Sequence, residues 1–280
     1  MKKVNTFSFQ GVKGAYSEQA GLKLYPHAKS FPCSTFEEMF EQVRNERVDA
    51  AMVPIENSLA GRVADTQRLI PDSSLKITEE FFFEVNHNLM GINGSTISDI
   101  KRIHSHEQGI AQCRNKIIQL NKEMIVEADT AGSAKMISEL NNIEDAAIAS
   151  ELAAKIYNLE ILETNFQDSL NNVTRFLVMQ KELAEINPSS NHVLTTLVFN
   201  VRSIPAALYK CLGGFASNGV NITKLESYIH PQGFDVAQFY IDFEGHPDNP
   251  SVKLVLEEMK FFCKHLKIVG VYKKAKFRKK

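Results

Sequence analysis

The sequence predicts an α/β protein built from two domains. Short apolar runs alternate with helical patterns through residues 1–180, which is typical of βαβ units and largely parallel sheets. A turn-rich segment without apolar periodicity, Lys181–His192, interrupts this pattern and is expected to be a linker. A chain of 280 residues is long enough for two domains with separate cores.

The first domain, residues 1–182, is expected to contain strands separated by helices. The predicted strands are Thr6–Phe9, Ala50–Val53, Lys76–Phe83, Arg102–Ser105, Met124–Glu127, Ala146–Ala149, Glu160–Leu162 and Arg175–Met179. The clearest helices are Thr35–Val43, Gln108–Leu120, Gly132–Leu140 and Ser150–Tyr157. Thr35 with Glu38 and Ser105 with Gln108 fit the capping-box pattern, so two helices are expected to begin at these pairs.

The second domain, residues 193–280, has a different order of elements. The predicted elements are a strand at Val193–Val201, a helix at Pro205–Ser217, strands at Val220–Tyr228 and Phe234–Phe243, a helix at Ser251–Cys263 and a strand at Leu266–Tyr272. Pro205 suits the first turn of its helix, where a backbone N–H is not needed. The βαββαβ order predicts a ferredoxin-like domain.

Composition and charge argue against several classes of protein. The net charge of −1 gives no reason to expect nucleic acid or an anionic membrane as a partner. No stretch approaches the ~20 apolar residues of a membrane span, and the N-terminus lacks a signal-peptide pattern, so a soluble, cytoplasmic protein is expected. Four well-separated cysteines predict free thiols rather than a metal site. The basic tail from Lys273 to Lys280 is expected to be a solvated end, with a phosphate-binding arm as the alternative.

Candidate site residues lie in loops that enter helices at small polar residues, and such loops gather where open α/β sheets bind ligands. The motifs are Gly11–Ser17, Val53–Gly61, Ser105–Cys113, Asp129–Ala134, Asn165–Asp168 and Asn172–Phe176. With these motifs in this order, and with the triplet Thr174-Arg175-Phe176 in the last, the sequence resembles the prephenate dehydratases.

That resemblance implies a lyase that converts prephenate to phenylpyruvate, carbon dioxide and water without a cofactor or metal. It implies a bilobal catalytic domain like the type-II periplasmic binding proteins, with chain crossings near Phe83–His87 and Gln167–Thr174. The C-terminal domain resembles an ACT domain, which in this family usually binds phenylalanine at a dimer interface. A homodimer or homotetramer regulated by phenylalanine is therefore expected.

Thr174 is the essential residue of the family, and the matching triplet assigns that role to it here. Because hydroxide is a poor leaving group, the reaction needs a hydrogen-bond donor at the departing ring hydroxyl. Arg175 either binds a substrate carboxylate or, if the triplet is extended, points away and pairs with Glu56. Glu56 can assist a dianionic substrate only if it is protonated or neutralised by an arginine, and a purely structural role is the alternative.

Other candidates each have a functional and a structural interpretation. Residues expected to bind substrate also include Asn57, Ser58, Ser105, Gln112, Thr130, Ser17 and Phe176. Ser105 is expected to cap a helix whose N-terminus can bind an anion, and Gln112 lies two turns further along the same face. His87 and His106 lie near or within these motifs but are expected to be structural.

The expected effector site lies in the second domain. Its candidate residues are Ala206, Ala207, Leu208, Asn218, Asn221, Glu226 and Ser227. Two positions depart from the family pattern, because Ala206 replaces a glycine and Tyr228 replaces an arginine. The alternatives to prephenate dehydratase activity are arogenate dehydratase activity or a non-catalytic bilobal sensor of amino acids.

Overall fold

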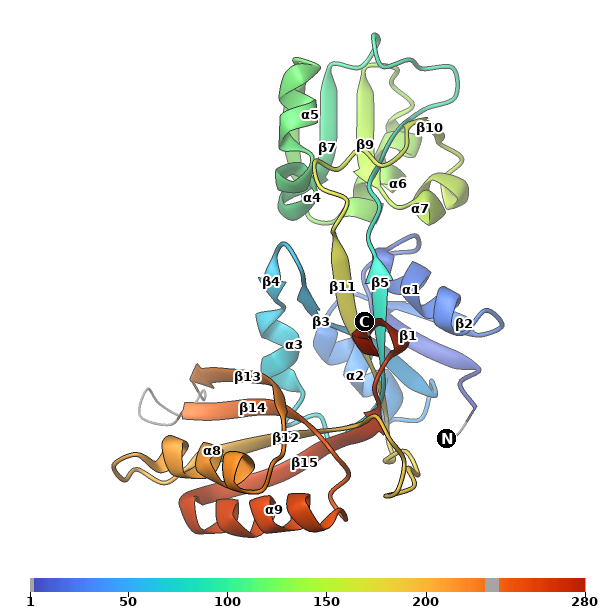
Figure 1. Cartoon of the computed structure of the whole chain (residues 1–280). Helices are drawn as coiled ribbons and strands as arrows, with labels where there is room; N and C mark the ends of the chain where they lie inside the picture. The colour runs from blue at the N-terminus through green and yellow to red at the C-terminus, as the bar shows by residue number, and fades with distance from the viewer. Residues whose placement is uncertain (1–2, 230–236, 280) are drawn as a thin grey trace. The chain divides into compact units, whose positions relative to one another are not determined.

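A computed structural model describes residues 3–229 and 237–279, and it has the mixed α/β architecture that the sequence predicts (Figure 1). Contacts divide the chain into two compact units. The first unit comprises Val4–Ala64 and Phe81–Phe176, and the second comprises Asp65–Glu80 and Leu177–Lys280 with the N-terminal residues. These units differ from the predicted domains, residues 1–182 and 193–280, because residues 65–80 belong to the second unit by their contacts. The predicted domain boundaries stay a prediction.

One lobe of the first unit is a mixed sheet with helices. Its elements are β1 (Thr6–Gln10), α1 (Tyr16–Leu24), β2 (Lys29–Cys33), α2 (Phe36–Arg44), β3 (Ala50–Asn57) and β4 (Gly61–Arg62). Strand β1 pairs in parallel with both β2 and β3, whereas the short β4 is antiparallel to its neighbour β3. Helix α2 begins where predicted, since the Thr35 hydroxyl accepts a hydrogen bond from the Glu38 N–H, and its apolar Met39, Phe40 and Val43 are buried.

The other lobe is a five-stranded sheet in the order β10-β6-β9-β7-β8. Its strands are β6 (Asn88–Gly91), β7 (Arg102–His106), β8 (Glu123–Glu127), β9 (Asp145–Ala149) and β10 (Glu160–Glu163). Its helices are α4 (Glu107–Gln112), α5 (Arg114–Gln119), α6 (Thr130–Leu140) and α7 (Glu151–Ile156). The central strand β9 is buried along its whole length, as expected for a strand covered on both faces.

The helix predicted over Gln108–Leu120 is wrong in one respect, because it is broken in two at Cys113. The Asp168 carboxylate accepts hydrogen bonds from the backbone N–H groups of Asn115 (3.0 Å) and Lys116 (3.2 Å). These donors belong to the first turn of α5, so a carboxylate distant in sequence gives that helix its own N-terminus.

The chain crosses between the two lobes twice, as predicted. It leaves through the end of β5 (Lys76–Glu84) and returns into β11 (Val173–Gln180). The two crossing segments are hydrogen-bonded to each other, with Val85 N donating to Asn172 O (2.8 Å) and Phe166 N donating to His87 O (2.7 Å). The bilobal arrangement expected of the type-II periplasmic binding proteins is therefore present.

The second unit contains the predicted βαββαβ element order. Its elements are β12 (Val193–Val201), α8 (Ala207–Ser217), β13 (Ile222–Ile229), β14 (Ala237–Glu244), α9 (Pro250–Phe262) and β15 (Cys263–Lys273). These strands lie in the order β13-β14-β12-β15 and pair antiparallel, which is the ferredoxin-like topology. Phe199, Phe215 and Phe243 belong to a buried core that also contains residues of α9. The strand predicted over Phe234–Phe243 corresponds to β14, and its predicted first residue, Phe234, lies outside the described residues.

Two further predictions for this unit are corrected. Helix α8 begins at Ala207 rather than Pro205, because Ala206 has a left-handed backbone (φ 60°) that cannot continue a helix backwards. The basic tail is not simply solvated in its described part: Arg278 contacts the buried carboxylate of Glu80 at 2.8 Å within a 3₁₀ turn (Lys276–Lys279). A buried carboxylate needs such a partner, and the tail provides one.

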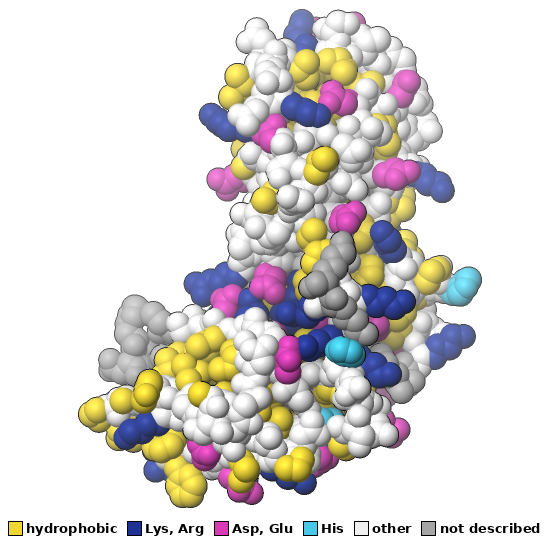
Figure 2. All heavy atoms as spheres, in the orientation of Figure 1, with side chains coloured by type: hydrophobic (Ala, Val, Ile, Leu, Met, Phe, Trp, Pro, Cys, Tyr) yellow, Lys and Arg dark blue, Asp and Glu magenta, His cyan; other side chains and the backbone are white. Residues whose placement is uncertain are grey.

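The visible surface carries interspersed charges of both signs (Figure 2), in agreement with the small net charge. Among the described residues, no helix is long and apolar enough to span a membrane. The helix α3 (Ala64–Leu69), with only six residues, is the chain's entry into the second unit.

Candidate active site

Thr174 is the second residue of β11 and lies where the chain re-enters the first lobe. Its side chain is largely buried, with 9% of the residue exposed. The hydroxyl oxygen accepts a hydrogen bond from Asn57 Nδ2 at 2.9 Å. Within the described ranges 3–229 and 237–279, no acceptor contacts the hydroxyl hydrogen itself. The hydroxyl can therefore donate to a ligand while its oxygen is polarised by an amide.

Asn57, the last residue of β3, determines the direction of that hydrogen bond. Its Oδ1 accepts from the backbone N–H groups of Leu59 (2.9 Å) and Ala60 (2.8 Å), which can only donate. The amide nitrogen must therefore face the other way, toward Asn172 Oδ1 (2.7 Å) and the Thr174 hydroxyl. Asn57 thus acts as a fixed donor beside Thr174.

Ser58 joins the loop after β3 to the start of β11. Its hydroxyl donates to the Asn171 carbonyl (2.6 Å) and accepts from the Val173 N–H (2.9 Å), while its own N–H donates to the Val173 carbonyl (2.9 Å). Both hydroxyl functions are occupied by backbone groups. This geometry gives Ser58 a role in holding the threonine strand; a contact with substrate stays a prediction.

Arg175 and Glu56 form an ion pair, with Nη1 and Oε1 separated by 3.1 Å. Arg175 is 1% exposed, and its strand position next to Thr174 directs it to the opposite face. Of the two alternatives for Arg175, the pairing with Glu56 is present. The pair also answers the charge problem at Glu56, because an arginine neutralises the carboxylate near an anionic site. Phe176, the third residue of the triplet, is fully buried in the core.

Gln112 is the last residue of α4, and a second asparagine, Asn172, links it by hydrogen bonds to Asn57 beside Thr174. Its Oε1 accepts from Asn172 Nδ2 (2.8 Å) and lies 2.7 Å from His87 Nε2. Gln112 also lines a cavity of about 470 Å³. The rest of that lining is formed by Leu59, Ala60, Gln108, Ala111, Asp168 and Ser169. Asn172 and His87 were not among the predicted site residues, because only the fold brings them to Gln112.

The helix cap predicted at Ser105 is wrong. Strand β7 continues through His106, whose side chain accepts from the Gln108 N–H and caps α4. Ser105 is fully buried and donates its hydroxyl to the Ile148 carbonyl at 2.8 Å. A Cβ on Gly109 would lie 2.6 Å from the Ser105 oxygen, so these two small residues allow α4 to approach β7 closely. Substrate contact by Ser105 stays a prediction, and the hydroxyl already has a backbone acceptor.

Thr130 and Ser17 lie in the first turns of two helices. Thr130 opens α6 directly after Asp129, whose carboxylate accepts from the Gly132 N–H as the helix cap. Ser17 is partly exposed in the first turn of α1. In the described part of the chain neither is hydrogen-bonded to the network around Thr174 and Gln112, so their contact with substrate stays a prediction.

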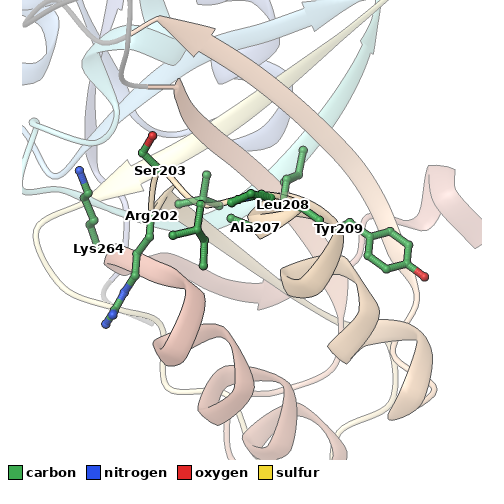
Figure 3. Close-up of a pocket in the computed structure, with 10 residues that line it drawn as sticks. Arg202, Ser203, Ala207, Leu208, Tyr209 and Lys264 are labelled. Carbon is green, nitrogen blue, oxygen red and sulfur yellow. The ribbon is translucent and has the colours of Figure 1, made fainter.

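The predicted effector residues fall into two groups in the second unit. Ala206, Ala207 and Leu208 line a cavity of about 510 Å³ at the start of α8, together with Arg202 and Lys264 (Figure 3). The remaining four candidates, Asn218, Asn221, Glu226 and Ser227, are not part of that lining. Asn218 Nδ2 donates to Gly214 O and Glu258 Oε1, and Glu226 pairs with Lys224.

Residues 7–184 match the family model described as "Prephenate dehydratase". The chain belongs to the prephenate dehydratase family. It is therefore a member of a family of lyases that act on prephenate.

Two relatives are similar to this chain over nearly all of its residues. A bifunctional N-acyl-homoserine lactone acylase/prephenate dehydratase of Komagataeibacter europaeus is 44% identical, over 98% of this chain and 97% of its own length. Arogenate dehydratase/prephenate dehydratase 2 of Arabidopsis thaliana, a chloroplastic protein, is 39% identical over 95% of this chain and 72% of its own length.

Solved structures are similar over both units of the chain. GqqA, described as a novel type of quorum quenching acylase, has a TM-score of 0.92 and 44% identity, covering 98% of this chain and 99% of that one. The prephenate dehydratase of Arthrobacter aurescens in complex with L-Phe has a TM-score of 0.86 and 31% identity, covering 96% of this chain and 90% of its own.

Proposed function

We propose that this chain catalyses the decarboxylative dehydration of prephenate to phenylpyruvate. The observation that supports it most directly is the hydrogen bond that the Thr174 hydroxyl accepts from Asn57, which leaves the hydroxyl hydrogen able to donate to a ligand. In the reaction the ring carboxylate leaves as carbon dioxide, and its bonding electrons enter the ring. The ring hydroxyl departs with one proton as water, so prephenate dianion and a proton give phenylpyruvate, carbon dioxide and water.

Thr174 assists the departing hydroxyl by donating a hydrogen bond that strengthens as negative charge develops there. A neutral threonine is too weak an acid to supply the proton alone, so its role is that of a positioned donor. The Arg175–Glu56 pair keeps a bare carboxylate from repelling the substrate. Prephenate aromatises as it breaks down, so the site needs orientation and donors rather than a strong base.

Substrate choice between prephenate and arogenate is the finer part of the proposal. The two substrates differ in the side chain, where prephenate has a keto oxygen and arogenate an ammonium group. Relatives of both names match the chain, and we propose prephenate. Steady-state rates of the purified chain with each substrate, with a chelator present, test this. The expected result is a larger kcat/KM for prephenate that the chelator leaves unchanged; a larger value for arogenate would contradict it.

A second activity is supported by one specific comparison. The relative that is 44% identical over nearly both full lengths carries N-acyl-homoserine lactone acylase in its name. If this chain shares that activity, it hydrolyses the amide bond of such a substrate, so that the substrate and one water give a fatty acid and homoserine lactone. Chromatography of an N-acyl-homoserine lactone incubated with the purified chain decides, and unchanged substrate at high enzyme concentration rules the second activity out.

Regulation by phenylalanine is proposed for the second unit as an ACT domain. The βαββαβ topology and the relative solved with L-Phe support it. The cavity at the start of α8 is lined by the Ala206–Leu208 segment and by two cations, Arg202 and Lys264, whose charges suit a carboxylate (Figure 3). A homodimer or homotetramer is proposed with it, since effector pockets of such domains form at subunit interfaces.

A cytoplasmic location is proposed from the thiols. The four cysteines, Cys33, Cys113, Cys211 and Cys263, are buried and free. Even the closest pair, Cys211 and Cys263, has its sulfur atoms 3.7 Å apart, whereas a disulfide requires about 2 Å. Free thiols persist in reducing compartments.

A further inference from the structure

We propose that His87 is a positioning residue for Gln112, fixing the amide so that its oxygen is occupied and its N–H donors remain available to a substrate in the cavity that Gln112 lines. The proposal rests on the proposed dehydratase function and names a residue that selects between its two substrates. His87 lies in the first crossing segment between the lobes, and Gln112 lies at the end of α4. Their Nε2 and Oε1 atoms are 2.7 Å apart.

The direction of each bond follows from the fixed amide of Asn57. Because Asn172 Oδ1 already accepts from Asn57 (2.7 Å), its Nδ2 must be the group that faces Gln112 (2.8 Å). Gln112 therefore presents its oxygen to Asn172. The same oxygen lies against His87 Nε2, so this ring nitrogen must carry a hydrogen. Gln112 thus has both lone pairs of its oxygen occupied.

Tyr16 maintains this tautomer from the other side of the ring. Its hydroxyl lies 2.7 Å from His87 Nδ1 and 3.2 Å from the Asn86 carbonyl, and the two rings meet edge to face with centroids 5.3 Å apart. Because Nδ1 of a neutral ring that carries its hydrogen on Nε2 can only accept, the shorter contact is the one to which the phenol donates. A neutral imidazole with a hydrogen on Nε2 has an acceptor at Nδ1, which the phenol can satisfy. Burial raises the pKa of Tyr16 well above its ordinary value, so the phenol keeps the hydrogen that it donates. The backbone N–H of His87 is held by Gln167 Oε1 at 2.8 Å.

The consequence concerns the cavity beside Gln112. With its oxygen occupied, the Gln112 amide offers only donors, and in the described part of the chain these hydrogens have no acceptor. Donors complement a keto oxygen or a carboxylate and oppose an ammonium group. If the amide were reversed, it would present an acceptor that suits an ammonium group. By fixing the Gln112 amide, His87 therefore favours a 2-keto acid side chain, as in prephenate, over the 2-amino acid side chain of arogenate.

The test compares three variants of the full chain with the wild type. His87→Phe keeps the ring size but removes both nitrogens, His87→Gln keeps an N–H donor, and Tyr16→Phe removes only the hydroxyl that selects the tautomer. For His87→Phe we expect the KM for prephenate to rise by about tenfold or more. The ratio of kcat/KM for prephenate over arogenate should fall by a similar factor. His87→Gln should recover most of that ratio, and Tyr16→Phe should give an intermediate value.

Two outcomes would overturn the proposal. An equal loss on both substrates, with an unchanged ratio, would mean that His87 only supports the fold. A direct measurement is independent of turnover: ¹⁵N NMR of the histidine rings should show His87 as the Nε2–H tautomer, with Tyr16→Phe allowing a mixture. A wild-type ring protonated on Nδ1 alone would contradict the proposal that His87 donates to Gln112. If the wild type used neither substrate, the proposed function would fail, while the tautomer measurement would still test whether His87 fixes the Gln112 amide.

Discussion

Glu56 illustrates how much a single buried partner matters at the scale of one residue. Its carboxylate faces Arg175, which is almost completely buried, whereas the Glu56 side chain is about one third exposed. Glu56→Gln leaves the guanidinium without its full counter-charge. Because water reaches the glutamate side, we expect a loss of about 1–3 kcal/mol in the free energy of unfolding, less than for a fully buried pair.

Urea denaturation measures this loss, with Glu257→Gln on the exposed face of α9 as the matched control. The control should stay within about 0.5 kcal/mol of the wild type. If Glu56→Gln is as stable as the control, the ion pair does not stabilise the fold and its role must be sought in substrate binding.

His87 makes a separate prediction about pH. Burial lowers the pKa of His87 below its ordinary value, although the hydrogen bond to Gln112 partly opposes the shift. The unfolded chain therefore binds this proton at higher pH than the folded chain. The stability that the protein has with a neutral His87 is fully present above about pH 6.5. The free energy of unfolding then decreases as the pH falls toward the lowered pKa, with a slope of at most ~1.4 kcal/mol per pH unit.

Thermal or urea unfolding between pH 7.5 and 5 checks this slope, and His87→Gln should flatten it. Replacement of the exposed His27 by glutamine serves as the control and should leave the slope as in the wild type. A His87→Gln protein with the wild-type slope would show that another group carries the pH dependence.

Some of the site could be predicted from the sequence and some could not, for a physical reason. Thr174, Asn57 and the pairing of Arg175 with Glu56 follow from motifs and from the alternation of side chains along a strand. The contacts of His87 join positions 71 and 25 residues apart in the sequence, to Tyr16 and Gln112. No local pattern encodes such contacts, because they depend on how the two lobes fold together.

At the scale of an element, the start of α8 explains a departure from the family pattern. Ala206 replaces the usual glycine and adopts φ 60° and ψ 23°, a conformation that glycine reaches without steric cost. Ala206→Gly should therefore relieve strain, partly offset by the greater freedom of glycine in the unfolded chain. We expect a gain of up to about 1 kcal/mol in the free energy of unfolding.

Ala207→Gly is the matched control, one residue further along in the helix itself. Here glycine should lower the free energy of unfolding by about 1 kcal/mol, since a helical position favours alanine. Denaturation of both variants compares the signs directly. A loss at both positions would mean that the left-handed backbone of Ala206 carries no significant strain.

Helix ends were the least predictable feature of the elements. Thr35 caps its helix as expected, and Asp129 caps α6 in the same way, because each accepts a hydrogen bond from an N–H three residues along the chain. The cap of α5 comes instead from Asp168, which is more than fifty residues away in the sequence from the helix that it starts. At Ser105 the strand simply continues one residue further, so the small polar residue became a buried packing group.

At the scale of the whole molecule, the order of elements was predictable but the grouping into units was not. Alternating patterns predicted the α/β class and the βαββαβ order, whereas the two crossings were expected from the family resemblance. The return of Asp65–Glu80 to the second unit depends on pairing such as that between Ile77 in β5 and Gly270 in β15. Hydrophobic patterns identify strands but do not determine which distant strand each one joins.

The proposed assembly gives a prediction at this scale. The full chain should sediment as a homodimer or homotetramer, and calorimetry should detect phenylalanine binding. Tyr228 removes the charge and donors of the usual arginine, so the binding is expected to be weaker than in relatives that keep it. Lys264→Ala, in the cavity at the start of α8, should weaken it further, whereas the exposed Lys253→Ala should not. A monomeric chain with no phenylalanine heat would contradict the regulatory proposal.

The most direct test of the dehydratase proposal is the rate of phenylpyruvate formation from prephenate by Thr174→Val and Thr174→Ser. Valine keeps the branched shape and removes the hydroxyl, whereas serine keeps the hydroxyl that Asn57 orients. We predict that Thr174→Val lowers kcat by on the order of 10²–10³, the effect of removing one positioned donor, while Thr174→Ser retains most of the rate. A folded Thr174→Val enzyme within about threefold of the wild type would contradict the role assigned to this hydroxyl.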